Sequence, residues 1–300
     1  MERYVVHKGV YCQVFEHGWR VKQWRSEATG QQELMVWPRK VYVPLDDYDN
    51  PEVHAGPEVD QSNTEEEKAR LERQRLLGLE RSAARAKRTC RHKIKSASFA
   101  SLLTCTYREN QTNFDKVRED WAAMLRKLRK VLPGFRAVYA FEKQERGAWH
   151  VHAAIDKLPT HIDVPGAGRV RSWDYLRRVW RAIVGDGNID VDGHRKTRHG
   201  LPGKHRARES LAKLAGYVSK YLTKDHSSGP AGRNRWGSTQ GIEVSKPVVW
   251  DMPDMPLSEL VGLAFACPDG HRIVSHRVDR YGKFWVLYTE PGEAESSVDG

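Results

Sequence analysis

Two pairs of side chains with reactive chemistry and regular spacing lie in the second half of the sequence. His150 and His152 are one residue apart in a segment that alternates like a β-strand, so both imidazoles point to one face. Tyr217 and Tyr221 are four residues apart in a helical segment, where residues i and i+4 are neighbours. The first pair can bind a metal ion, and the second can present two nucleophilic hydroxyls. Together they suit the cleavage of a phosphodiester bond with one end kept covalently attached.

Each pair also has a more ordinary interpretation. A His-x-His sequence in a strand is more often an exposed polar face than a metal site. Two tyrosines at helical spacing are usually aromatic residues of the core or its rim. The reactive hypothesis therefore depends on the presence of both pairs and on their neighbours.

A third metal ligand is available upstream of the histidines. Glu142 lies eight positions before His150, and the intervening sequence contains a strand-like run at 137–141 and a turn at 145–147. A hairpin would bring Glu142 back beside the histidines. Two imidazoles and one carboxylate suit Mn²⁺ or Mg²⁺ and also admit zinc. Glu145 is the alternative carboxylate, but its place at the turn predicts that it is solvated.

The elements that must hold these residues follow from hydrophobic periodicity. Strands and helices are predicted in the order strand 99–107, helix 114–132, strand 137–141, strand 149–155, helix 173–183 and strand 187–192. This βαββαβ order predicts an α+β, ferredoxin-like fold with a central antiparallel sheet. The tyrosine helix follows, over about 208–224.

Three segments of the sequence resemble the three motifs of the HUH endonucleases, and of rolling-circle replication initiators in particular. The Leu-Thr-Cys-Thr-Tyr sequence at 103–107 resembles their first motif, and Glu142 with His-Val-His at 150–152 resembles their metal-binding second motif. The Tyr-Val-Ser-Lys-Tyr sequence at 217–221 resembles their two-tyrosine third motif. The spacing is most similar to that of initiators from single-stranded DNA phages and related plasmids. The resemblance covers about residues 98–240.

The resemblance implies an RRM-like nuclease core and a mechanism. A tyrosine hydroxyl would attack the scissile phosphate with the help of bound Mn²⁺ or Mg²⁺, leaving a 5′-phosphotyrosine and a free 3′-hydroxyl. A second tyrosine would allow a second cleavage while the first remains linked, so a circle can be closed without ATP. Lys220 and Lys224 each lie three positions after a tyrosine, where they can stabilise a phenolate or clamp a phosphate; the alternative is a solvated face. Tyr221, next to Lys220, is slightly favoured for the first attack.

The charge of the chain agrees with DNA as the partner. The formal net charge is +11 and the pI is about 9.5, which favours a polyanion, although charge alone does not separate DNA from RNA or an anionic membrane. A basic stretch at 194–208 predicts a DNA-contacting loop. We expect single-stranded or hairpin origin DNA to contact five basic residues: Arg146, Arg206, Arg208, Lys220 and Lys224.

The cysteines and the remaining motifs bear on the compartment and on other partners. The four cysteines are scattered without metal-binding spacing, which is typical of reduced cytosolic thiols. Cys105 departs from the first motif, where an apolar residue is expected, but a buried cysteine behaves as a small hydrophobe. No apolar run of membrane length is present, and no phosphate-binding loop of the NTPase type. We therefore expect a protein of the bacterial cytoplasm that works with a separate helicase and not with a membrane.

The sequence divides into five segments by composition. They are a small β-rich unit at 1–47, an acidic linker at 48–67, a basic helix at 68–97, the nuclease domain at 98–240 and an extension at 241–300.

Two alternative functions remain open at this point. A two-tyrosine transposase would use the same chemistry on transposon ends. A non-catalytic ferredoxin-like module that binds single-stranded nucleic acid would form no covalent adduct.

Overall fold

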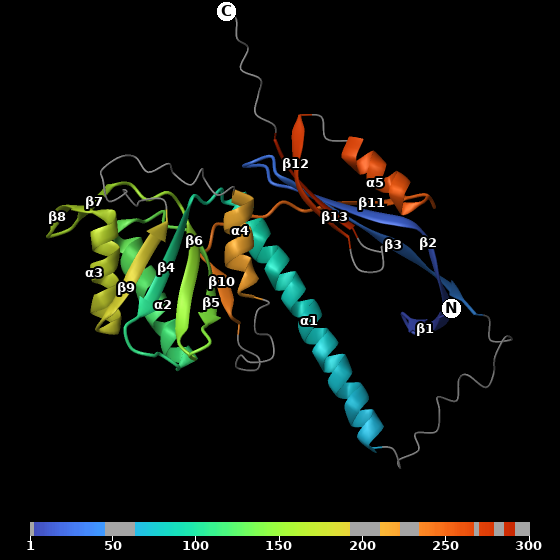
Figure 1. Cartoon of the computed structure of the whole chain (residues 1–300), viewed down its shortest axis with the longest axis horizontal. Coiled ribbons are helices and arrows are strands. Elements are labelled where there is room, and N and C mark those ends of the chain that lie inside the picture. The colour runs from blue at the N-terminus through green and yellow to red at the C-terminus, as the bar shows by residue number, and fades with distance from the viewer. Residues whose placement is uncertain are drawn as a thin grey trace, which may run out of the picture. The chain divides into compact units, whose positions relative to one another are not determined.

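The computed structural model describes residues 3–45, 64–192, 211–222, 234–266, 270–278 and 285–291. These residues form five helices and antiparallel sheets, which confirms the predicted α+β class. The chain divides into two compact units (Figure 1). Unit 1 combines Met1–Glu72 with Ser245–Gly300, and unit 2 is Arg73–Val244.

Unit 2 is built on a five-stranded sheet in which every pairing is antiparallel. The strand order is β10-β5-β6-β4-β9. Along the chain, the unit's elements after its first helix are β4 (Ser101–Tyr107), α2 (Phe114–Val131), β5 (Ala137–Lys143), β6 (Trp149–Ile155), β7 (His161–Val164), β8 (Gly168–Arg171), α3 (Ser172–Val184), β9 (Gly187–Asp192), α4 (Leu211–Lys220) and β10 (Trp236–Ser238). The elements predicted from 99 to 192 are present, and the β7–β8 hairpin is an addition between β6 and α3.

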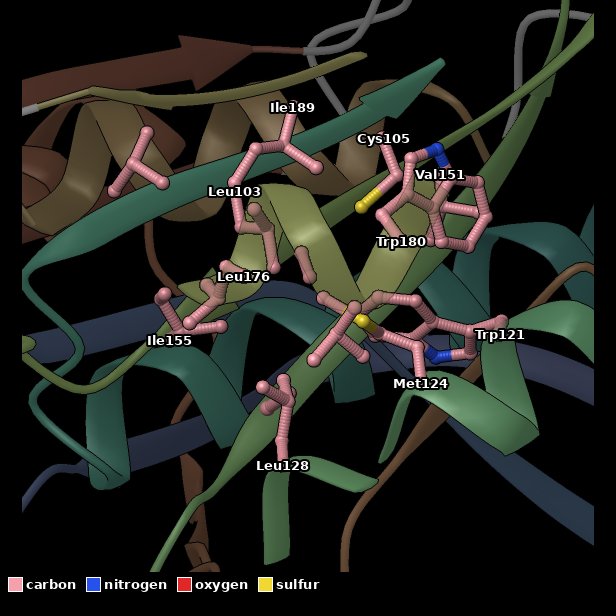
Figure 2. Close-up of a cluster of buried hydrophobic side chains, with 14 of the residues drawn as sticks. Leu103, Cys105, Trp121, Met124, Leu128, Val151, Ile155, Leu176, Trp180 and Ile189 are labelled. Carbon is pink, nitrogen blue, oxygen red and sulfur yellow. The ribbon is translucent and has the colours of Figure 1, made fainter. Parts of the chain in front are cut away.

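One face of this sheet carries the main hydrophobic core, which α2 and α3 cover. Alternate residues of β4 and β6, such as Leu103 and Val151, meet Trp121 of α2 and Trp180 of α3 (Figure 2). Cys105 is fully buried among them, and its burial raises the pKa of the thiol. It therefore occupies an apolar position, as expected for a buried cysteine.

The other face of the sheet is covered by α4 and by the C-terminal part of α1 (Thr64–Ser96). Ala140 and Ala154 of the sheet pack with Val218 of α4 and Ile94 of α1. Because these sheet residues are small, α4 can lie close to β5 and β6. Figure 1 shows α3 and α4 on opposite sides of the sheet.

A tight turn joins β5 to β6 and fixes their register. The amide of Gln144 donates to the carbonyl of Ala148 at 2.8 Å, and Gly147 adopts a φ of 86°, which favours glycine. As a result Glu142 lies directly opposite His150, and Ala140 lies opposite His152.

Unit 1 is a six-stranded antiparallel sheet made from both ends of the chain. Its path is β1-β2-β3-β13-β12, and β11 pairs with the outer part of β2. The helix α5 packs on this sheet around Val21, Val36 and Leu287. The elements are β1 (Arg3–His7), β2 (Val10–Arg25), β3 (Gln32–Pro44), β11 (Val248–Met252), α5 (Leu257–Ala266), β12 (His271–Val278) and β13 (Trp285–Pro291).

Composition predicts separate segments at 1–47 and 241–300, whereas the structure pairs them in one sheet. Pairing between distant strands has no local signature in a sequence, because alternation shows only that a strand has an apolar face. The helix α1 also begins at Thr64, before the predicted end of the acidic linker; residues 46–63 of that region lie outside the described residues. Within the described part of the chain, α1 and the other helices all lack an apolar stretch long enough to span a membrane.

Candidate functional site

Glu142, His150 and His152 lie on one face of the β5–β6 hairpin. The register pairs Glu142 with His150, and residues opposite one another in an antiparallel pair point to the same face. His152 is two residues further along β6 and so shares that face. This is the face covered by α4, where burial excludes most water from both histidines.

The His152 ring is held at both of its nitrogens. Its Nε2–H donates to Glu142 Oε2 at 2.8 Å, since an ionised carboxylate only accepts. The hydroxyl of Thr104, which faces His152 across the β4–β6 pairing, lies 3.2 Å from Nδ1 and donates to it. Sequence reasoning missed Thr104 as a site residue, although its alternation with the buried Leu103 and Cys105 places it on this face.

His150 has a different environment from His152. The amide N–H of Gln144 donates to His150 Nδ1 at 3.1 Å, while the Gln144 oxygen accepts from Arg146 Nε at 3.0 Å. His150 Nε2 is buried and has no hydrogen-bond partner among the described residues. Burial lowers the pKa of His150 to about 4, and the neighbouring His152 and Arg146 act in the same direction while Glu142 opposes them. The ring is therefore neutral at pH 7, as a metal ligand must be.

The donor atoms of this face suit a divalent metal ion. Two neutral imidazoles and one carboxylate are available, and the unpartnered Nε2 of His150 is the kind of buried polar atom that a ligand satisfies. As the side chains stand, no three His, Cys, Asp or Glu residues of the described chain are grouped to hold an ion. The Glu142 carboxylate forms its hydrogen bond with His152 instead.

The two tyrosines meet the same histidine from the α4 side. Tyr217 lies in α4, and Tyr221 lies in the turn directly after it, where the predicted helix would have continued. The Tyr221 ring stacks on His152 with 4.4 Å between ring centroids, and the Tyr217 ring meets His152 edge-on at 5.9 Å. The two tyrosine rings are 5.4 Å apart. Both predicted nucleophiles therefore lie against one predicted ligand.

The two tyrosines differ in burial. Tyr221 is only 4 % exposed, while Tyr217 is partly exposed. Burial raises the pKa of Tyr221, and a hydrogen bond with Tyr217 and the charge of Glu142 raise it further. The Tyr221 hydroxyl is therefore protonated at neutral pH in the metal-free state.

The predicted basic residues are only partly covered by the described chain. The Lys220 ammonium lies 4.0 Å from the centroid of the Tyr217 ring and 4.9 Å from that of Tyr221, so it borders both nucleophiles. Arg146 is exposed in the β5–β6 turn and reaches His150 through Gln144. The predicted alternative ligand, Glu145, is exposed in the same turn. Three further predicted contacts lie outside the described residues: Arg206, Arg208 and Lys224.

Comparison with known proteins identifies one family with similarity to this region. Residues 100–226 match a family model of replication-associated proteins of the ORF2 type. The matched segment contains every predicted site residue and is consistent with a rolling-circle replication initiator. No curated protein and no solved structure matches the chain.

Proposed function

We propose that the protein is a metal-dependent, site-specific DNA-nicking endonuclease and strand transferase of the two-tyrosine HUH type, which initiates rolling-circle replication. The observation that carries this proposal is the gathering of Glu142, His150, His152 and both tyrosines on one face of one sheet. The match to a family of replication-associated proteins over the same residues supports it independently.

The topology of unit 2 supports assignment to a ferredoxin-like HUH core. From β4 to β9 the principal elements follow the order βαββαβ, and the four strands lie in the order β5-β6-β4-β9 with antiparallel neighbours. This arrangement leaves one face of the sheet free of α2 and α3, and the proposed site is on that face.

Glu142, His150 and His152 would hold the ion, for which Mn²⁺ or Mg²⁺ is the proposed identity. When bound, the ion supplies Lewis-acid polarisation of the scissile phosphate. Thr104 and Gln144 orient the two rings through their Nδ1 atoms, as supporting residues of metal sites do.

The chain itself supplies the nucleophile and its activation. A tyrosine Oη attacks the phosphorus, the bond from phosphorus to O3′ breaks, and the proton lost by the tyrosine is balanced by the one gained at the 3′-hydroxyl. Lys220 is positioned to stabilise the phenolate, because its ammonium borders both rings. The greater exposure of Tyr217 favours it for the first attack, whereas the sequence slightly favours Tyr221.

The proposed substrate is single-stranded or hairpin origin DNA, in agreement with the net charge of +11. Lys220 and Arg146, with Arg206, Arg208 and Lys224, are the proposed DNA contacts. A separate helicase would unwind the duplex, and the proposed setting is the cytoplasm of a bacterial host.

The metal assignment is tested with labelled single-stranded DNA from a random pool. We expect nicking that EDTA abolishes and that Mn²⁺ or Mg²⁺ restores. His150→Ala and His152→Ala should each reduce nicking by about 100-fold or more while DNA binding is retained, and the exposed His17→Ala is the matched control. Full activity in excess EDTA would exclude the metal role.

The tyrosine assignment is tested through the covalent adduct. Tyr217→Phe with Tyr221→Phe keeps both rings and removes only the hydroxyls, so the double variant should fold and bind DNA but form no adduct. Tyr175→Phe on α3 is the control. Peptide mass spectrometry of the wild-type adduct would identify the attacking residue. Attachment to neither tyrosine would overturn the mechanism, and DNA binding with no adduct at all would favour a non-catalytic module.

A further inference from the structure

A strongly basic groove lies between the β7–β8 hairpin and the first half of α3. It has a volume of about 560 Å³. Its lining holds four arginines, one histidine and one aspartate, and Val170 is its one apolar residue. None of these residues belongs to the proposed nuclease site.

The hairpin presents its charged side chains on one face by strict alternation. His161 pairs with Arg171, and Asp163 pairs with Arg169, so these four side chains share one face. The intervening Ile162 is buried. All four charged or polar side chains are exposed, which leaves Arg169 and Arg171 directed toward a ligand and not into the core.

The helix α3 supplies the other wall. Arg177 stacks on the Trp173 ring, with its guanidinium carbon 3.7 Å from the ring centroid. That contact holds the guanidinium in place, and its Nε–H is buried without a hydrogen-bond partner among the described residues. Arg178 is exposed one residue later, and Asp174 is the one acidic residue of the lining.

The chemistry of the lining points to a phosphodiester backbone. Four arginines against one aspartate give a formal charge of +3 with His161 neutral. Sites for small organic ligands are mostly apolar with a few polar groups, and this lining is the reverse. Guanidinium groups match phosphate oxygens in geometry and charge, and contacts of this kind dominate binding to DNA.

The groove lies on the side of the sheet away from the proposed nuclease site. Leu176 and Trp180 of α3 pack in the core with α2, whereas Tyr217 and Tyr221 pack against the other face. Figure 1 shows α3 and α4 separated by the sheet. A strand that is cut beside α4 would therefore have to pass around the edge of the sheet to reach α3.

We propose that this groove binds the sugar–phosphate backbone of DNA as a second anchor, remote from the cleavage site. The inference rests on the proposed function for the identity of the polyanion. It assigns the groove to a segment of the strand that flanks the nick, so it adds to the DNA footprint and not to the chemistry.

The test compares charge reversals inside and outside the groove. Arg169→Glu with Arg178→Glu removes two exposed guanidiniums, and Arg126→Glu with Lys130→Glu on α2 is a control with the same charge change. We expect the groove variant to bind a long mixed-sequence single-stranded DNA roughly 10-fold more weakly at low salt. Its slope of log affinity against log salt should fall by about 1.4, the value for two lost contacts with single-stranded DNA. The control variant should show much less of either effect.

Length and competition decide what occupies the groove. Binding of a short oligonucleotide, and its nicking, should be the same for the groove variant and the wild type, because a short strand reaches only one site. An equal loss in the control variant, or an unchanged salt slope in the groove variant, would overturn the proposal. Abolition of the difference by inorganic pyrophosphate would assign the groove to free phosphates instead. The binding measurement needs no nicking, so it remains decisive even if the proposed nuclease activity is absent.

Discussion

His150 and His152 are neighbours on one strand, but their surroundings give them different roles in the metal-free protein. His152 is fixed by Glu142 on one side and by Thr104 on the other. His150 has one nitrogen bound by Gln144 and the other without a partner among the described residues. The His150 ring is thus ready to accept a ligand, while the His152 ring must exchange a hydrogen bond for one.

Thr104→Val should weaken the proposed site without disturbing the sheet. Valine has a similar shape and a high strand preference, so the substitution removes only the bond to His152 Nδ1. Loss of such a supporting contact typically costs about 10–100-fold in metal affinity or activity. We expect a higher Mn²⁺ concentration for half-maximal nicking, with Thr106→Val as the control on the same strand face. An unchanged metal dependence would remove Thr104 from the site.

The stability of the metal-free protein should fall between about pH 6.5 and pH 4 because of His150. Its folded pKa is lowered to about 4 from an ordinary value of 6.5, so the unfolded chain binds this proton first as the pH decreases. The contribution is complete above pH 6.5 and is lost as the pH falls to about 4, with a total on the order of 3 kcal/mol.

Urea unfolding across this pH range, in EDTA, measures that loss. His150→Gln removes the titrating group and should flatten the difference, while the exposed His17→Gln should keep the wild-type profile. Parallel curves for the wild type and His150→Gln would contradict the prediction.

At the scale of elements, the sequence predicts those parts of unit 2 that have strong periodicity. The predicted helix at 114–132 matches α2 closely, because an amphipathic stripe lies between the cap at Asn113, whose side chain accepts from the amide of Lys116, and the stop at 133–134. The strands around Glu142 and His150 follow from alternation and from the glycine turn. Elements that hold the predicted ligands and tyrosines were therefore predictable.

The remaining features depend on three-dimensional neighbours. The strands β7 and β8 have four residues each, too few to establish a period, and β10 has three. The roles of Thr104 and Gln144 follow from the register between strands, which the sequence does not specify. The end of α4 before Tyr221 was also missed, since apolar residues continue through the turn.

Two glycines should respond in opposite directions to replacement by alanine. At Gly187, where β9 begins, a Cβ would lie 2.6 Å from the carbonyl oxygen of Thr106 and 2.9 Å from Trp180 Nε1. These two atoms form a hydrogen bond, so Gly187→Ala should destabilise the protein by about 1–3 kcal/mol. Gly78 lies in α1 with open space around it, and Gly78→Ala should stabilise by about 0.5–1 kcal/mol. Denaturant midpoints measure both changes, and equal signs would contradict the packing described.

At the scale of the whole molecule, the two units have separate cores, and the sheet of unit 1 needs both ends of the chain. Residues 73–244 contain every member of the two hydrophobic clusters of unit 2. We expect this fragment to fold alone, with cooperative thermal unfolding measured by circular dichroism. An unfolded fragment would show that the division into units has no energetic meaning.

Removal of residues 285–300 from the full chain gives the complementary result. It deletes β13, which lies between β3 and β12 in the sheet, so unit 1 should become sensitive to protease while unit 2 resists it. Uniform resistance or uniform sensitivity of the two units would contradict this expectation.

The position of β13 in the sheet has a consequence for the order of events on the ribosome. The N-terminal strand β3 emerges early, but its partner β13 is among the last segments to be translated. At about 5–20 residues per second, an interval of roughly 10–50 s separates them. Unit 2 is complete within that interval, so it can finish folding while one edge of the N-terminal sheet still waits for its neighbour.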